Sequence, residues 1–154
     1  MNYWLLKTEP ETFGVSDLAA LPDRTTCWDG VRNYQARNYL RDGMHKGDAA
    51  FIYHSSCEVP GIAGIARIKG AGYPDDTAFR KRHPHYDAGS DPAHPRWYMV
   101  DVQLQRAMKR TISLDELRTH ADGKLNGMMI LRAGNRLSIT PVEERHWRFI
   151  LTLE

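Results

Sequence analysis

The sequence predicts a single α+β domain built on a curled, partly closed antiparallel β-sheet, with short helices inserted between the strands. Short apolar segments with strand-like alternation outnumber long amphipathic segments. Glycine, proline and helix-capping residues separate these segments at short intervals. The chain has 154 residues, the size of one domain, and it contains no internal repeat, coiled-coil heptad or low-complexity tract. We therefore expect one domain over residues 1–154.

Apolar patterning predicts the strands. Residues 3–7 form a short aromatic and apolar segment that ends before Pro10, where the missing N–H would interrupt a hydrogen-bonded ladder. We expect this strand to be buried on both faces. The clearest alternation lies at residues 97–105, where one face is apolar and the other largely polar. Further strands are predicted at residues 49–54, 61–69 and 136–139, with residues 149–153 as a final strand or tail.

Capping residues predict the helices. Ser16 is placed to cap a short helix that ends before Pro22, and Asp29 or Gly30 can cap a second helix that ends near Gly43. Two capping boxes follow, one at residues 113–116 and one at residues 140–143. They predict a helix to about residue 120 and a helix to residue 147 or 148, with a short helical core at residues 128–131 between them.

The composition of residues 70–96 predicts a long, mostly irregular loop, because the segment contains four prolines, several aspartates and three of the seven histidines. Loops of this length in a compact domain are often functional. Four side chains there are possible metal ligands: His83, His85, Asp87 and His94. No cysteine accompanies them and their spacing is not that of a zinc site, so we predict no structural metal and no cofactor.

Composition limits the classes of partner. The net charge of +2 permits a polyanionic partner without requiring one. The two cysteines, Cys27 and Cys57, do not form a disulfide framework and suit a reducing cytosol. No stretch resembles a signal peptide or a membrane span. We therefore expect a cytoplasmic protein with no membrane partner, while the oligomeric state stays undetermined.

Residues 28–38 combine a tryptophan, two arginines, two asparagines and a tyrosine beside Gly30. On the predicted helix, Val31 and Tyr34 share one face with Leu40, whereas Asn33 and Arg37 lie one turn apart on another. Such a density of planar polar groups is typical of a recognition site. The alternative is an ordinary amphipathic helix with Trp28 in the core and solvated arginines, and the residue types alone do not decide between the two.

Residues 28–38, together with Tyr3–Pro10, resemble the EVE domain family, a branch of the PUA-like superfamily related to YTH domains. Residues 51–55, 61–66, 95–102 and 137–142 continue the resemblance in the family's order. It implies a PUA-like β-barrel. It also implies a non-catalytic module that holds a modified base of DNA or RNA, which we expect to be methylated or hydroxymethylated, as YTH domains hold a flipped methylated base in an aromatic cage.

The resemblance and the chemistry of the side chains together suggest a binding site. Trp28 matches the cage tryptophan, and Lys7-Thr8 match a Lys-Ser pair of the family, with threonine here in place of serine. We infer Trp97 as a second wall from its place at a strand entry, with Tyr73 or Tyr86 as alternatives. Further predicted contacts are Asn33 to the ring edge, Arg37 to a phosphate or carbonyl, and His54 and Ser55 at the rim.

Four cations are candidates for contacts with the nucleic-acid backbone: Arg32, Arg80, Lys81 and Arg82. Two other functions stay open. One is a nuclease or another nucleic-acid-processing enzyme that uses His54 and Ser55, although no nucleophile elbow, paired carboxylates or metal motif supports it. The other is a pocket for a free nucleotide-like metabolite.

Overall fold

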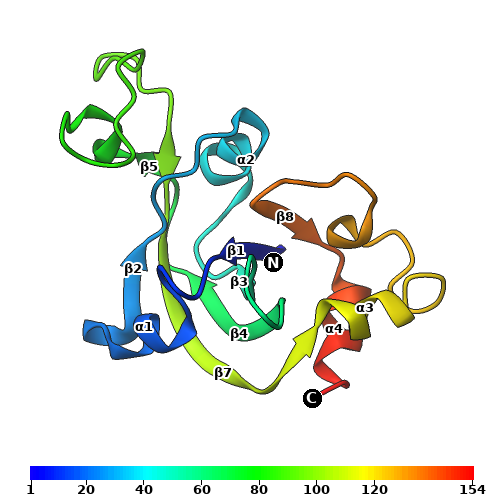
Figure 1. Cartoon of the computed structure of the whole chain (residues 1–154). Coiled ribbons are helices and arrows are strands. Elements are labelled where there is room, and N and C mark those ends of the chain that lie inside the picture. The colour runs from blue at the N-terminus through cyan, green and yellow to red at the C-terminus, as the bar shows by residue number, and fades with distance from the viewer.

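A six-stranded, strongly curled sheet forms the centre of the protein (Figure 1), in a computed structural model that describes all 154 residues. The strand order is β2-β7-β4-β3-β1-β8. Neighbouring strands are antiparallel except β1 and β3, which run parallel. The curled sheet expected from the sequence is therefore confirmed, with one parallel pair that makes it mixed. The strands are β1 (Tyr3–Thr8), β2 (Thr25–Cys27), β3 (Ala49–His54), β4 (Gly61–Ile68), β7 (Asp101–Ser113) and β8 (Ile139–Val142).

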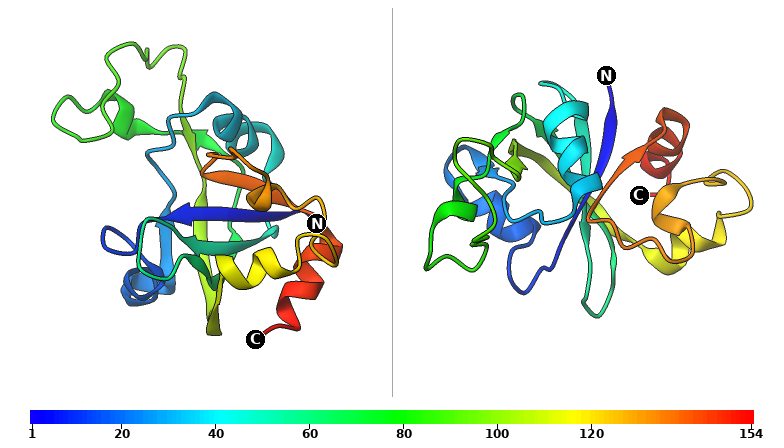
Figure 2. Two further views of the ribbon diagram at one scale, coloured as in Figure 1. Left: turned by 45° about the vertical axis from the view of Figure 1, so that its right-hand side comes forward. Right: turned by 90° about the horizontal axis from the view of Figure 1, so that it is seen from above.

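Short helices and a second, two-stranded sheet surround this centre (Figure 2). β5 (Tyr73–Pro74) pairs with β6 (Tyr98–Met99), and this pair forms the base of the projecting long loop. The helices are α1 (Val15–Ala20), α2 (Tyr34–Asn38), α3 (Leu114–Thr119) and α4 (Glu144–Leu151). α2 continues into a π-helical turn at Tyr39–Gly43, and single 3-10 turns occur at Pro22–Arg24, Asp76–Phe79 and Met129–Leu131.

The first strand separates two hydrophobic cores. Successive side chains of a strand point to opposite faces, so Trp4 and Leu6 pack into one core and Leu5 into the other. The first core lies toward α1 and α2, and the second lies toward α3 and α4. In the second core Phe51 stacks on Trp147 with ring centroids 3.9 Å apart. The expected burial of β1 on both faces is confirmed, because every position from Trp4 to Leu6 is buried.

β7 extends beyond the predicted strand. It runs through Ser113, pairs with β2 at one end and with β4 along its length, and has register shifts opposite Ile62–Gly64 and Ile65–Ala66. Such irregularities bend a strand and increase its twist, so they help the sheet to curl. Exposed residues at 105–107 and 109–111, all polar except Ala107, obscure the alternation that predicts strands. The sequence therefore did not reveal this second half.

In the C-terminal region a strand and a helix occur as predicted, but their bounds were wrong. Residues 140–143 do not open a helix: Thr140 and Pro141 lie in β8, which pairs with β1. β8 is the outermost strand of its sheet, where a residue without an N–H is tolerated. The helix begins only at Glu144 and extends through Phe149 to Leu151, where a final strand or tail was expected.

Two predicted helix starts also shift. α1 is capped at Gly14, whose N–H donates to Asp17 Oδ2 at 2.8 Å, so Ser16 lies inside the helix. α2 begins at Tyr34 after an Asn33 cap, not at Asp29 or Gly30. Gly30 has a φ of 78°, a left-handed conformation that a right-handed helix cannot contain. Residues 28–33 are therefore free to form a loop around the site described below.

We predict that Gly61→Ala destabilises the protein by about 1–3 kcal/mol, because overpacking a rigid site forces the backbone apart. A Cβ at this position would lie 2.3 Å from the backbone oxygen of Ile112, which cannot move away without disturbing the β4–β7 pairing. Urea unfolding measures the effect. Gly70→Ala is the matched control, since nothing lies within 4 Å of its added Cβ. Equal midpoints for both variants would contradict this packing.

Candidate functional site

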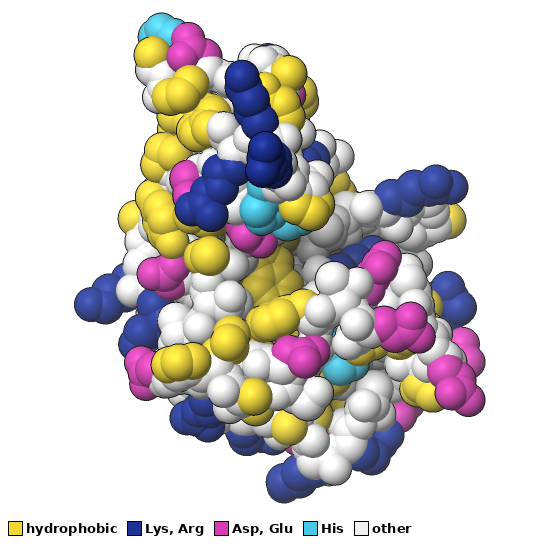
Figure 3. All heavy atoms as spheres, turned by 60° about the vertical axis from the view of Figure 1, so that its left-hand side comes forward, with side chains coloured by type: hydrophobic (Ala, Val, Ile, Leu, Met, Phe, Trp, Pro, Cys, Tyr) yellow, Lys and Arg dark blue, Asp and Glu magenta, His cyan; other side chains and the backbone are white.

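A cavity of about 520 Å³ opens between the end of β1, the segment after β2 and the long loop. Trp28 lines it together with Lys7 and Thr8 from β1 and His85 from the loop. Its volume is within the usual range for small-molecule sites. Figure 3 shows a hollowed face with hydrophobic side chains at the bottom of the hollow and histidine and basic side chains above it. The cavity therefore combines apolar and polar surfaces, as a site for a heterocycle requires.

Trp28 belongs both to the core and to the cavity. Its side chain is 8% exposed and packs in the first core, where Phe13 meets it edge-on with ring centroids 6.4 Å apart. The backbone N–H of Trp28 donates to the backbone oxygen of Val100 at 2.7 Å, which extends the edge of the sheet. The two interpretations of Trp28 made from the sequence are therefore compatible, since a rigidly packed indole also forms part of the cavity wall.

Lys7 and Thr8 end β1 at the cavity. The backbone N–H of Lys7 donates to the backbone oxygen of Ser138 at 2.9 Å. Burial lowers the pKa of its ammonium group, and no carboxylate pairs with it. Thr8 Oγ1 donates to Phe13 O at 2.5 Å, so its lone pairs stay available as acceptors. The end of β1 thus brings a hydroxyl acceptor to the cavity, and an unpaired cation lies between this cavity and a second hollow beside Tyr53.

Asp75 anchors the long loop to the cavity wall. Its buried carboxylate accepts hydrogen bonds from Gly30 N at 2.9 Å, Arg32 Nη1 at 3.0 Å, and both N and Oγ1 of Thr77. Burial alone would raise the pKa of Asp75, but these hydrogen bonds outweigh it and the pKa is lowered. Arg32 also donates to the backbone oxygen of His85 at 2.6 Å. Arg32 is therefore a structural clamp, and its predicted contact with a nucleic-acid backbone is not supported.

Asn33 and Arg37 lie outside the cavity. Asn33 Oδ1 accepts from Ala36 N at 3.0 Å as the cap of α2. Arg37 donates to the backbone oxygen of Arg96 at 2.7 Å and lies over the ring of Tyr34. Neither residue lines the cavity. The expectation that Asn33 or Arg37 points into the cavity is therefore wrong. Capping of α2 already uses the polar group of Asn33, and attachment of the long loop uses that of Arg37.

His54 and Ser55 do not reach the cavity either. His54 Nε2 accepts from Val15 N at 3.2 Å, and burial lowers the pKa of the imidazole, so the ring is neutral and its lone pair is occupied. Ser55 lies beside the end of β1, where its N–H donates to Thr8 O at 2.9 Å. Both residues support the strand end that carries Thr8 and are not placed at the rim.

Trp97 lines a hollow next to the cavity of Trp28 and not the cavity itself. It is 6% exposed, stacks on Tyr34 with centroids 4.9 Å apart and donates from Nε1 to Asp87 Oδ2 at 2.6 Å. Tyr86 lines the same hollow, which shares Arg32 and His85 with the cavity. Tyr73 is turned elsewhere, because its hydroxyl donates to Asp101 at 2.6 Å. None of the three proposed second walls therefore lines the cavity of Trp28.

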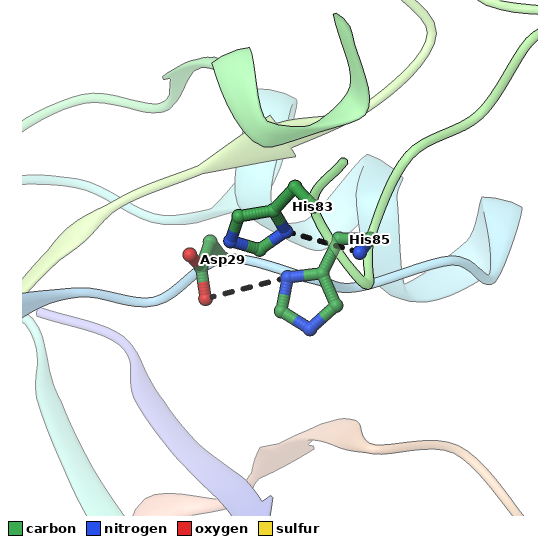
Figure 4. Close-up of side chains that lie close together, drawn as sticks. All are labelled: Asp29, His83 and His85. Atoms are coloured by element: carbon green, nitrogen blue, oxygen red, sulfur yellow. Dashed lines mark hydrogen bonds and ion pairs between the residues drawn. The ribbon is translucent and has the colours of Figure 1, made fainter. Parts of the chain in front are cut away.

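Asp29, His83 and His85 gather at the cavity edge (Figure 4), with their possible ligand atoms within 4.8 Å of one another. Only Asp29 and His85 line the cavity itself. His83 Nδ1 accepts from His85 N at 3.0 Å, so in the neutral ring Nε2 carries the proton and is not free to bind a metal. The arrangement therefore suits a hydrogen-bonding cluster better than a metal centre.

Sequence reasoning did not identify Asp29 and His85 as contacts of the cavity. Asp29 was considered as a helix cap and His85 only as one of several possible metal ligands. The nearest signal was the position of Asp29 beside Trp28. The contact with His85 depends on how the long loop folds back over Gly30, where an added Cβ would lie 2.5 Å from the imidazole.

The Arg80–Arg82 segment lies on the projecting loop. All three residues are exposed, and Arg80 pairs with Asp76 within one turn. Lys81 and Arg82 form no ion pair in the structure, so they remain available to a polyanion. No helix in the structure is both long enough and apolar enough to span a membrane.

Comparison with known proteins gives a consistent result. The family model described as the EVE domain matches residues 2–153. Thymocyte nuclear protein 1 of Rattus norvegicus is 50% identical, over 99% of this chain and 74% of the relative, and the Homo sapiens protein of that name is 48% identical over the same shares.

Solved structures agree with these relatives. Human THYN1 protein in complex with 5-methylcytosine containing DNA superposes with a TM-score of 0.94 at 47% identity, covering 99% of this chain and 97% of that one. A protein from Pseudomonas putida superposes with a TM-score of 0.92 at 44% identity, covering 98% of each chain. The chain therefore has the PUA-like fold that its resemblance implied.

We predict that Asp75→Asn lowers the free energy of unfolding by about 3 kcal/mol, because it leaves the Arg32 guanidinium without its buried partner. The native pKa of Asp75 is lowered, so its contribution is present above the unfolded-state pKa of about 3.9 and is lost as pH falls through the native value. Unfolding curves between pH 2 and 7 measure both effects.

The matched control is Asp76→Asn, which removes an exposed carboxylate paired with Arg80 and should change stability by less than about 0.5 kcal/mol. The free energy of unfolding of the Asp75→Asn variant should also fall less steeply at acid pH than that of the unmodified protein. If both variants unfolded at the same urea concentration, the anchoring role of Asp75 would be excluded.

Proposed function

This chain belongs to the EVE domain family, and from that premise we propose that it binds DNA containing a methylated cytosine without cutting it. The modified base leaves the helix and enters the cavity beside Trp28. The observation that carries the proposal is that one cavity combines a rigid indole with unpaired polar groups from β1 and from the long loop.

Physical chemistry supports this use of the cavity. Extruding a base costs a few kcal/mol of lost stacking and pairing, which the protein must return. Stacking on an aromatic side chain contributes about 1–3 kcal/mol per base. Trp28 is already fixed in the core, so little conformational entropy is lost when a base packs against it. Lys7 and Thr8 offer a donor and an acceptor at the same end of the sheet.

The nearly identical fold of human THYN1 protein supports the choice of DNA and of methylcytosine, since that protein is described in complex with 5-methylcytosine containing DNA. A binding module fits the site better than an enzyme does. His54 and Ser55, the pair that a nuclease would use, lie away from the cavity, and the His54 lone pair is occupied. The expectation of a cytoplasmic protein stays a prediction, and the proposal needs only that protein and DNA share a compartment.

We predict that Trp28→Ala weakens binding of a 5-methylcytosine oligonucleotide by about 5- to 150-fold, the equivalent of one lost stacking contact. Fluorescence anisotropy with a labelled duplex measures the affinity, and circular dichroism monitors the fold. Because removing a buried indole also costs stability, Trp28→Phe is the second variant. It keeps an aromatic ring in the core and should give an intermediate loss of affinity.

Tyr34→Ala is the matched control, because Tyr34 is 53% exposed and stacks on Trp97 outside the cavity. It should bind like the unmodified protein. Competition with free 5-methyl-deoxycytidine distinguishes a strand reader from a metabolite pocket, since a strand reader needs the neighbouring phosphates for affinity. Affinity that survives in every Trp28 variant would rule out this cavity as the binding site.

We also propose that Lys81 and Arg82 contact the DNA backbone from the long loop. The double variant Lys81→Ala/Arg82→Ala should bind modified and unmodified duplexes more weakly by a similar factor. The slope of log K against log salt should become less steep by about 2, one unit for each lost phosphate contact. Arg148→Ala, in which an exposed arginine of α4 is removed, is the control. An unchanged salt slope would exclude these contacts.

A further inference from the structure

Asp29 and His85 bring unpartnered hydrogen-bonding groups to the cavity wall. The Asp29 carboxylate accepts no hydrogen bond within the protein, and its nearest basic neighbour is His85 Nδ1, 3.9 Å from Oδ1. His85 Nδ1 is buried without a hydrogen-bond partner. A buried nitrogen without a partner is costly, and an unpaired carboxylate that faces a cavity is free to bind a ligand.

The surroundings determine which atom of His85 carries the proton in the neutral ring. Nδ1 faces the Asp29 carboxylate, whose negative charge favours a proton on that nitrogen. Nε2 then carries the lone pair. Figure 4 shows this second nitrogen at the open lower edge of the ring, and it forms no hydrogen bond within the protein. Asp29 and His85 Nε2 are therefore both hydrogen-bond acceptors.

The protein holds the imidazole in place before any ligand arrives. The ring lies directly on Gly30, where any side chain would collide with it, and the backbone oxygen of His85 is clamped by Arg32 at 2.6 Å. The backbone N–H of His85 donates to His83 Nδ1. A group fixed in this way discriminates between ligands more sharply than a mobile one, because it cannot turn to suit a different hydrogen-bonding pattern.

Lys7 supplies the complementary charge from β1. Its ammonium group forms no ion pair, and the residue lies between this cavity and a second hollow beside Tyr53. The cavity therefore presents two acceptors, Asp29 and His85, with a cation at its border. Cytosine has a matching distribution, since its exocyclic amino group carries two N–H donors and its O2 is an acceptor.

We propose that Asp29 and His85 accept hydrogen bonds from the exocyclic amino group of the bound base, so that the site distinguishes 5-methylcytosine from thymine. This inference rests on the proposed function. The two bases share the 5-methyl group, but thymine has a carbonyl at position 4 where 5-methylcytosine has the amino group. A carbonyl oxygen facing two acceptors makes no hydrogen bond, and sites built to bind a donor reject analogues that lack it.

The test uses duplexes that differ at one position, with either 5-methylcytosine or thymine opposite guanine. Anisotropy titrations should show that the unmodified protein prefers 5-methylcytosine by about ten-fold or more. His85→Phe keeps a ring over Gly30 and removes both nitrogens, whereas Asp29→Asn replaces one acceptor oxygen by a donor. Each variant should reduce the preference several-fold, mainly by weakening binding of the 5-methylcytosine duplex.

His94→Phe is the matched control, because His94 is an exposed histidine of the same loop that does not line the cavity. Thermal unfolding checks that each variant is folded, and Asp29→Asn stands as the independent variant if His85→Phe is not. The thymine–guanine mismatch is the same in every titration, so differences between variants report the cavity and not the ease of extruding the base.

The outcomes separate the two proposals. If the 5-methylcytosine duplex binds and Trp28→Ala removes binding, but the preference over thymine is unchanged in both variants, the role of Asp29 and His85 is overturned and the proposed function stands. If the unmodified protein binds methylated and unmethylated duplexes equally, the proposed function fails and this inference fails with it.

Discussion

The buried carboxylate of Asp75 holds together two parts of the chain that the sheet does not join. It accepts from Thr77 within the long loop, and from Gly30 N and Arg32 in the segment before α2. Water is excluded there, so these hydrogen bonds are strong and the loss of one partner is costly. The cavity wall formed by residues 28–32 and His85 has no regular secondary structure of its own, and this carboxylate gives it a fixed shape.

The polar side chains around the site divide into two groups. Arg32, Arg37 and Arg96 are bonded to carboxylates or to backbone oxygens and hold the long loop to itself and to residues 32–37. Lys7 and Asp29, which line the cavity, have no hydrogen-bond partner. Folding accounts for the first group, because buried polar groups without partners are destabilising. It does not account for the second, and that asymmetry is a stronger indication of a ligand site than the density of polar residues at 28–38.

The sequence predicted most of what depends on local pattern. The apolar run at residues 3–7 was enough to predict a strand buried on both faces, and the likeness at Trp28 and Lys7-Thr8 identified three residues that line the cavity. Features that depend on which other segment a stretch of chain pairs with could not be predicted from the sequence. Pro141 suits a helix start as well as an edge strand, and only its pairing with Trp4 decides between them. Asn33 suits a ring edge as well as a cap, and only the left-handed Gly30 shows that the helix begins later.

The position of β1 between β3 and β8 has a consequence for biosynthesis. The other neighbour of β1 is β8, so the first strand made by the ribosome gains its second partner only when residues 139–142 have emerged. Pairings between distant segments form slowly, because long loops must close first. Ser138, which precedes β8, lines the cavity and accepts from the N–H of Lys7. A nascent chain released before this segment would therefore contain Trp28 and the long loop but no complete pocket.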